Sequence, residues 1–166
     1  MSSKSETLQK GDWIVHLYYG IGQIIGTETK KIGGNKEEYY KVRTKNSTYY
    51  VPVNNAINDR IRPLSSEYKL RKAKQILREE PREFPDNHNE RRRLLNETTG
   101  DRSIYNTAEL IRDLSHRKQE HGLNDFEQKT LETTEQLFVL EWSIIQEISE
   151  EEAQEKLEKI IEETIE

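Results

Sequence analysis

The stretch Lys10-Gly-Asp-Trp-Ile-Val-His-Leu-Tyr-Tyr-Gly-Ile-Gly-Gln-Ile24 holds two apolar segments separated by a turn, and it decides the fold of the first part of the chain. Residues 12–16 are short and apolar-rich, and residues 20–31 alternate in part between apolar and polar side chains. Both patterns predict β-strands. Gly20, Gly22 and Gly26 are expected at bulges or tight bends, because glycine inside a strand often marks such a position.

Two further segments, 37–44 and 47–52, are rich in tyrosine, valine and threonine. The glycine pair at 33–34 and the Lys-Asn pair at 45–46 are turn signals between them. Four or five short strands at this spacing predict a small, strongly bent antiparallel β-barrel over residues 11–62. Trp13, in the first strand, is expected in its core.

From Ser65 onward the apolar residues recur at helical spacing. Cap-like residues and glycines then divide the rest of the chain into about five helices. The expected segments begin near 65–66, 86, 103, 124 and 149, and Trp142 is expected in their core. The prediction is therefore an α+β chain of two domains, a β-barrel over 1–64 and an all-α domain over 65–166.

Composition narrows the classes of function. The chain has 166 residues, of which 32% are hydrophobic and 34% are charged. It has no cysteine, and this excludes disulfides, thiolate nucleophiles and cysteine-bound metals. It contains no run of about 18 apolar residues and no apolar secretion signal at its start, so we expect a cytoplasmic protein without a membrane span. The net charge of −5 is uneven, with +4 over 1–64, −2 over 65–145 and −7 over 146–166.

The spacing of the histidines and glycines does not match the usual catalytic, metal-binding or dinucleotide-binding motifs. His116 and His121 are five residues apart, a poor spacing for one helix face, and no His-Glu-x-x-His pattern occurs. Gly20, Gly22 and Gly26 are followed by another apolar strand and not by a helix, which argues against a dinucleotide site. We therefore expect no enzyme activity, no cofactor, no metal and no small-molecule substrate.

Two clusters point to binding instead. Tyr39-Tyr40 and Tyr49-Tyr50 fall on neighbouring strands, so one tyrosine of each pair faces inward and the other outward, where it either binds a protein or packs across strands. Arg91-Arg92-Arg93 is the densest basic run. It is either a solvated helix face or, together with Arg117, Lys118 and Lys129, part of a phosphate-binding patch.

The quoted stretch 10–24 resembles the opening of the CarD/CdnL family, which is shared with the polymerase-interacting domain of transcription-repair coupling factor. Tyr49-Tyr-Val-Pro-Val53 resembles the family's fourth-strand motif, and Ile111-Arg-Asp-Leu114 with Gln119-Glu-His-Gly-Leu-Asn124 resembles the hallmark of its helical domain. The likeness runs from about Leu8 to Ile161. It implies a Tudor- or SH3-like barrel that binds the RNA polymerase β subunit. It also implies a helical domain that contacts promoter DNA and stabilises the open complex.

The resemblance also implies roles for particular residues. The polymerase-binding residues would be Lys30, Tyr49, Tyr50, Val51 and Pro52, with Tyr50 at a position where the family often has arginine. The DNA-binding residues would be His88, Arg91, Arg92, Arg93 and Lys129, in weak contacts without sequence specificity. Many members carry a tryptophan wedge at the start of the second helix, whereas residues 86–89 here are Asp-Asn-His-Asn. Asn87 or His88 would act there more weakly.

Two hypotheses of function therefore stand. The first is a CarD-like transcription regulator that binds the polymerase β subunit and promoter DNA. The second is a protein-interaction adaptor on the polymerase without DNA contact, which the missing tryptophan and the acidic C-terminal segment favour.

Overall fold

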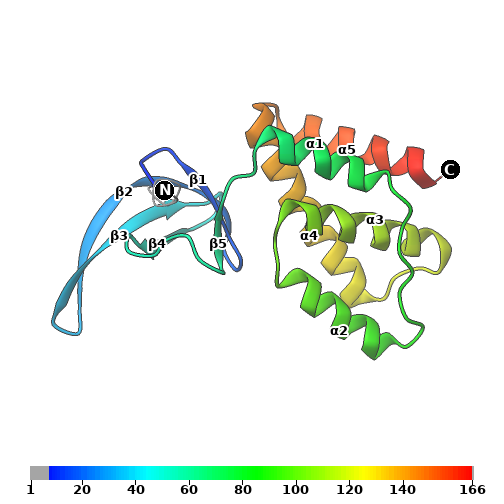
Figure 1. Ribbon diagram of the computed structural model, residues 1–166, viewed down its shortest axis with the longest axis horizontal. Helices are drawn as coiled ribbons and strands as arrows, with labels where there is room; N and C mark the ends of the chain where they lie inside the picture. The colour runs from blue at the N-terminus through cyan, green and yellow to red at the C-terminus, as the bar shows by residue number, and fades with distance from the viewer. Residues whose placement is uncertain (1–7, 166) are drawn as a thin grey trace. The chain divides into compact units, whose positions relative to one another are not determined.

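The computed structural model describes residues 8–165, and the chain divides into two compact units, Met1–Leu64 and Ser65–Glu166 (Figure 1). The first unit is a β-sheet unit and the second is a helical unit. Each unit has its own buried hydrophobic cluster. The α+β layout predicted from the pattern of residues is confirmed.

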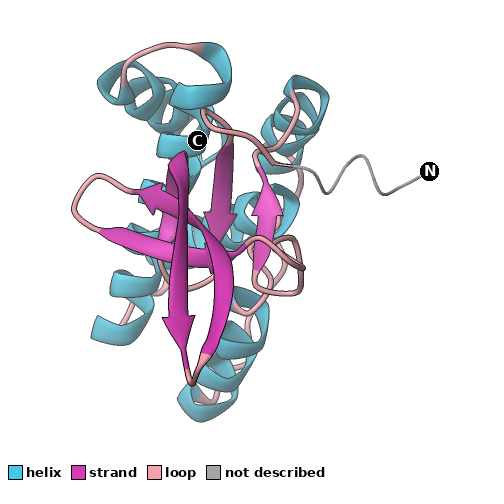
Figure 2. Ribbon diagram, turned by 90° about the vertical axis from the view of Figure 1, so that its left-hand side faces the viewer, coloured by secondary structure: helices cyan, strands magenta, loops and turns pink. Residues whose placement is uncertain are grey.

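The sheet has five antiparallel strands in the order β4-β3-β2-β1-β5. Its long hairpin is disturbed by a bulge between Ile24 and Gly26, and the strands bend strongly across one another (Figure 2). The strands are β1 (Trp13–His16), β2 (Gly20–Ile32), β3 (Asn35–Arg43), β4 (Thr48–Pro52) and β5 (Ile61–Pro63).

The strongly bent antiparallel sheet was predicted as a barrel, but the barrel does not close. Among the described strands, β4 pairs only with β3 and β5 pairs only with β1, so the two outer strands do not close the ring. The physical reason is the length of the outer elements. β5 has only three residues, and all three pair with β1, so it does not extend far enough to reach β4. Strand β4 therefore keeps an open edge.

The core of the sheet unit follows the alternation of side chains along the strands. Ile14 and Val42 are fully buried, and Ile24 and Val51 nearly so. Trp13 was expected in this core, but it is only half-buried, whereas the next three residues of β1 are buried. Gly22 lies against this core, where a Cβ atom would come within 2.6 Å of Val42 Cγ1.

The helical unit is built around α3, which contacts each of the other four helices. Ile111 and Leu114 of α3 are fully buried, and they join Phe138, Trp142 and Leu157 in one core. The Phe138 and Trp142 rings pack edge to face at 5.9 Å between centroids. The helices are α1 (Glu67–Leu77), α2 (His88–Thr99), α3 (Ile104–Glu120), α4 (Asp125–Gln146) and α5 (Glu150–Ile165).

Polar residues fix where these helices begin. Ser66, Asn87 and Ser103 are N-caps whose side chains accept hydrogen bonds from backbone N–H groups of the first turn. Asn124 and Glu127 form a capping box at the start of α4. The five predicted helices are thus confirmed, with starts within about two residues of the expected ones.

We expect Gly22→Ala to destabilise the sheet unit by about 1–3 kcal/mol, because the new methyl group must displace Val42 in a packed core. Gly26→Ala is the matched control, since no atom lies within 4 Å of its added Cβ. Amide hydrogen exchange across β2 and β3 measures the effect. Equal protection in both variants would contradict this account of Gly22.

Candidate protein and nucleic-acid interfaces

The outward face of the sheet carries one tyrosine from each predicted pair. Tyr40 and Tyr49 are buried at 7% exposure, whereas Tyr39 and Tyr50 are half-buried on the opposite face. The register explains this, because Tyr40 lies across from Val51, and Tyr50 lies across from Lys41. The expected division into inward and outward tyrosines is therefore confirmed.

Lys30 and Tyr50 form one feature on that outward face. The Lys30 ammonium lies 3.5 Å from the centroid of the Tyr50 ring, a cation–π contact. Lys41 of β3 pairs with Glu28 of β2 at 3.3 Å, so these two opposite charges are matched. The surface therefore presents a cation held in place by an aromatic ring, with the open edge of β4 alongside.

Of the five residues predicted to bind polymerase, two point the other way. Tyr49 and Val51 belong to the hydrophobic core of the sheet unit, and burial raises the pKa of the Tyr49 phenol well above its usual value. Only their backbone groups lie along the open edge of β4. Lys30, Tyr50 and Pro52 are on the outward face, so their side chains remain accessible in part.

Arg91 is not on the surface with the other arginines, which corrects the expectation that its side chain faces DNA. It is 9% exposed, and its Nε donates a hydrogen bond of 2.7 Å to a Glu127 carboxylate oxygen. Its Nη1 donates to the carbonyl oxygens of Pro85 and Asp86, at 3.2 and 2.6 Å. The guanidinium therefore joins the entry of α2 to the first turn of α4.

Glu127 is held as a carboxylate by the same contacts. Burial alone would raise the pKa of this group, but the hydrogen bonds from Arg91 and from the backbone of Asn124 lower it below the ordinary value. The charge on Arg117 acts in the same direction. Arg117, a candidate for the phosphate patch, thus contributes to this internal network.

The other predicted DNA-contacting residues are exposed, and several of them come together. Arg92 stacks on the ring of Phe126 with 4.1 Å between its Cζ and the ring centroid. His88 and Arg92 are four residues apart on α2, so they share one helix face. Lys129, also exposed, lies one turn beyond Phe126 on α4. We call His88, Arg92, Phe126 and Lys129 the α2–α4 strip. Arg93 is exposed on the next face of α2.

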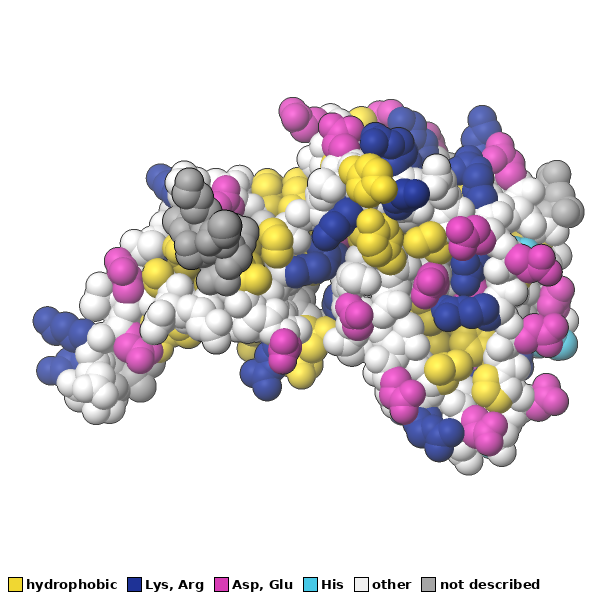
Figure 3. Space-filling view, viewed as in Figure 1, with side chains coloured by type: hydrophobic (Ala, Val, Ile, Leu, Met, Phe, Trp, Pro, Cys, Tyr) yellow, Lys and Arg dark blue, Asp and Glu magenta, His cyan; other side chains and the backbone are white. Residues whose placement is uncertain are grey.

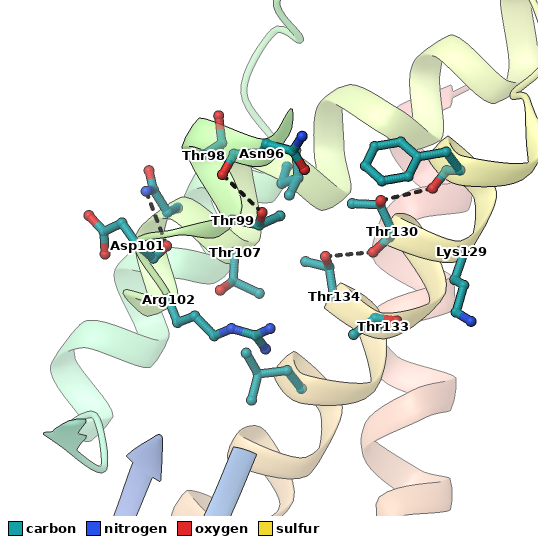
Figure 4. Close-up of a pocket in the computed structure, with 14 residues that line it drawn as sticks. Asn96, Thr98, Thr99, Asp101, Arg102, Thr107, Lys129, Thr130, Thr133 and Thr134 are labelled. Atoms are coloured by element: carbon teal, nitrogen blue, oxygen red, sulfur yellow. Dashed lines mark hydrogen bonds between the residues drawn. The ribbon is translucent and has the colours of Figure 1, made fainter. Parts of the chain in front are cut away.

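A pocket that the residue pattern did not predict adjoins this strip, with Phe126 and Lys129 in its wall (Figure 4). Its volume is about 230 Å³. Six of its lining residues are threonines: Thr98, Thr99, Thr107, Thr130, Thr133 and Thr134.

Five of the six threonine hydroxyls donate to a carbonyl oxygen three or four residues back on their own helix, as the Thr130 hydroxyl does to Phe126 at 2.8 Å. Arg102 extends into the space, and burial lowers the pKa of its guanidinium. The signal for this pocket was the run of threonines inside helices, where threonine is a weak helix former.

Within the described residues, no helix is both long and apolar enough to span a bilayer, and no three acidic or histidine side chains are gathered as metal ligands.

Comparisons with known proteins match each unit to a protein-family model. A family model of the CarD-like/TRCF RID domain matches residues 8–65, and a model of the CarD C-terminal domain matches residues 72–158. Together these matches define a class of transcription regulators that join a RID domain to a CarD C-terminal domain. The chain belongs to the CarD family.

Individual relatives agree with this assignment. A Bacillus subtilis protein named as a candidate transcription factor, YdeB, is 30% identical over 146 residues, covering 86% of this chain and 94% of the relative. Transcription-repair-coupling factors of Staphylococcus epidermidis and Staphylococcus aureus are 37% identical over 49 residues. That match covers 29% of this chain and 4% of those much longer proteins.

We expect Arg91→Ala to destabilise the helical unit by about 3–5 kcal/mol, because it leaves the Glu127 carboxylate buried without its partner. Glu127→Ala is expected to cost a similar amount, and the double variant less than the sum, since both remove one interaction. Arg93→Ala, at an exposed position, is the control and should change stability by less than about 0.5 kcal/mol. Urea denaturation measures all four. Additive effects of the two single variants would contradict a coupled pair.

Proposed function

We propose that this chain regulates transcription by binding the RNA polymerase β subunit through its sheet unit and promoter DNA through its helical unit. The observation that carries the proposal is the Lys30–Tyr50 contact on an outward sheet face beside the open edge of β4. The proposal assigns the α2–α4 strip, with Arg93, to the DNA.

The sheet unit suits a protein partner for three physical reasons. An open antiparallel edge offers unpaired backbone groups to which a partner strand can add. The Tyr50 ring presents a large, rigid contact surface, of the kind that contributes most to binding at interfaces. Lys30 supplies a fixed charge that selects an acidic counterpart. The likeness to transcription-repair-coupling factor, together with the RID-domain match over residues 8–65, supports polymerase as the partner.

The helical unit would make weak contacts with DNA. Arg92, Arg93 and Lys129 are exposed cations that can neutralise phosphates without reading bases. A chain with a net charge of −5 does not concentrate on free DNA by its overall charge. Once the sheet unit is bound to polymerase, however, the tethered helical unit meets promoter DNA at a high effective concentration. Binding to free DNA should therefore be weak and should weaken further with salt.

Many family members carry a tryptophan wedge at the start of the second helix, and Asn87 and His88 are the two candidates for that position here. The Asn87 side chain accepts hydrogen bonds from the backbone N–H groups of Asn89 and Glu90, so it is occupied as the N-cap of α2. His88 is exposed at the first residue of the helix. In this proposal His88 takes the place of the wedge, with weaker stacking than an indole.

The adaptor without DNA contact remains the second candidate, and one observation favours it. Arg91, the first of the three consecutive arginines, is buried and paired with Glu127. Only two of the three arginines are therefore exposed and able to contact DNA.

The polymerase contact is tested by Lys30→Glu in the full chain, with binding to the isolated β-subunit fragment measured by calorimetry. Charge reversal removes the cation on the Tyr50 ring, and we expect affinity to fall at least about tenfold. Lys36→Glu, an exposed lysine on β3, is the matched control and should change affinity by less than about twofold. Equal effects of the two substitutions would remove the basis for this contact.

The DNA contact is tested by the double substitution Arg92→Ala/Lys129→Ala, with the lifetime of the open promoter complex as the readout. We expect the lifetime gained from this protein to fall about three- to tenfold while binding to polymerase stays unchanged, since two phosphate contacts are lost. Lys10→Ala/Lys36→Ala removes the same charge from exposed positions of the sheet unit and serves as the control. An unchanged lifetime together with intact polymerase binding selects the adaptor.

A further inference from the structure

A second basic surface lies on the helical unit, away from the α2–α4 strip. Helix α1 and its C-cap carry five cations against the single acid Glu67. The acidic α5 has only two lysines, Lys156 and Lys159, and both line a groove that α1 also lines. Figure 3 shows lysine and arginine side chains gathered over α1 and α5. We call this feature the α1–α5 groove.

Cations dominate the groove. Arg71, Lys74 and Arg78 line it from α1 and its C-cap, and Lys156 and Lys159 line it from α5, against the single carboxylate of Glu163. The buried side chain of Trp142 lies between these two walls. In a chain with a net charge of −5, five cations against one acid form a strongly segregated patch.

The positive charges of the groove are only partly neutralised within the chain. Arg78 pairs with Glu163 at 3.7 Å and Lys156 pairs with Glu152 at 3.3 Å, both between exposed groups. Over residues 8–165, no carboxylate lies within salt-bridge distance of Arg71, Lys74 or Lys159. An anion in the groove would therefore relieve repulsion that the protein leaves in place.

Lys74 shows this repulsion most clearly. Its ammonium lies 4.7 Å from the centroid of the Trp142 ring. Its pKa is lowered first by partial burial and then by the charges of Lys156, Arg78 and Arg71, and only Glu67 acts in the opposite direction. The charged form of Lys74 thus lacks the partner that a bound anion would provide.

An exposed aromatic ring stands next to the groove. Tyr68 is 57% exposed, and the charged groups of Arg71 and Lys72 lie 5.9 and 5.7 Å from its ring centroid. Arg71 and Arg78 are seven residues apart, a rise of about 10 Å along α1, which is enough for two or three neighbouring phosphates. A cationic groove beside an exposed aromatic ring is the arrangement that binds single-stranded nucleic acid without sequence preference.

We propose that the α1–α5 groove binds single-stranded nucleic acid, with Arg71, Lys74 and Lys159 on the phosphates and Tyr68 stacked on a base. The concave shape favours one strand, because a duplex is a convex cylinder that would rest on the rims. The exposed ring of Tyr68 favours a nucleic acid over an acidic peptide. An acidic peptide would pair with the cations but has no base to stack on the ring. This site is separate from the α2–α4 strip, and its binding does not depend on that strip.

The test measures binding of the full chain to fluorescent oligo(dT) of about twelve nucleotides by anisotropy, in about 50 mM salt. We expect saturable binding whose logarithm falls with the logarithm of salt with a slope of about −2, as three neutralised phosphates of a single strand predict. Arg71→Glu/Lys159→Glu should weaken it at least about tenfold, and Tyr68→Ala about fivefold. Lys74 is left unchanged because of its contact with Trp142.

Two controls make the result specific. Lys10→Glu/Lys36→Glu changes the net charge equally at exposed positions of the sheet unit and should weaken binding by less than about twofold. Arg92→Glu/Lys129→Glu removes the α2–α4 strip and should do the same. If that variant alone abolishes binding, the groove proposal is overturned, while the proposed contact of the strip with DNA stands. Circular dichroism of each variant confirms that the helices are retained.

Two competitors decide the ligand class. The comparison uses the Arg92→Glu/Lys129→Glu variant, which lacks the strip proposed to contact duplex DNA. In that variant, a duplex of the same length and a polyglutamate peptide of the same charge should each bind at least about fivefold more weakly than oligo(dT). Equal or tighter binding of the duplex or of the peptide overturns the assignment to single strands.

Discussion

Arg91 and Glu127 meet at 2.7 Å inside the helical unit, and much of the surrounding geometry depends on that pair. Glu127 also completes the capping box that begins α4, and Arg91 also holds the Pro85 and Asp86 carbonyl oxygens before α2. One ion pair therefore sets both the start of α4 and the position of α2 against it. The contact of Arg92 with Phe126 follows, because the residue after Arg91 can reach α4 only if α2 lies close to it.

Burial divides residues that look alike in the chain. The three consecutive arginines separate into one internal residue and two surface residues, and the fourth-strand tyrosines separate in the same way. In both cases the inward member packs inside its unit, and the outward member stays at least partly accessible to solvent. An isolated buried charge would be costly, but Arg91 meets an ionised carboxylate and two carbonyl oxygens, so its desolvation is offset. The proposed contact surfaces thus lie directly beside residues that hold the units together.

The acidic net charge of the chain conceals how its cations are placed. The α2–α4 strip and the α1–α5 groove lie on different helices, and each is short enough that its local charge, and not the total of −5, decides what binds. Charges further apart than about 10 Å are largely screened at moderate salt, so the acidic residues elsewhere do not cancel these surfaces. A tethered protein can exploit such small surfaces, because it does not have to find DNA by bulk attraction.

Local patterns in the sequence determined the class of each unit: alternation and glycine turns predicted the strands, and apolar spacing with Ser, Asn and Glu caps predicted five helices. They also determined that one tyrosine of each pair points inward and the other outward, since a strand has a period of two. Only the tertiary structure decided that the sheet stays open, that Arg91 turns toward Glu127, and that two lysines of the acidic α5 face α1. Arg91 and Glu127 are 36 positions apart, and Lys74 and Lys156 are about 80 positions apart. Such contacts depend on how the helices pack, which no local period encodes.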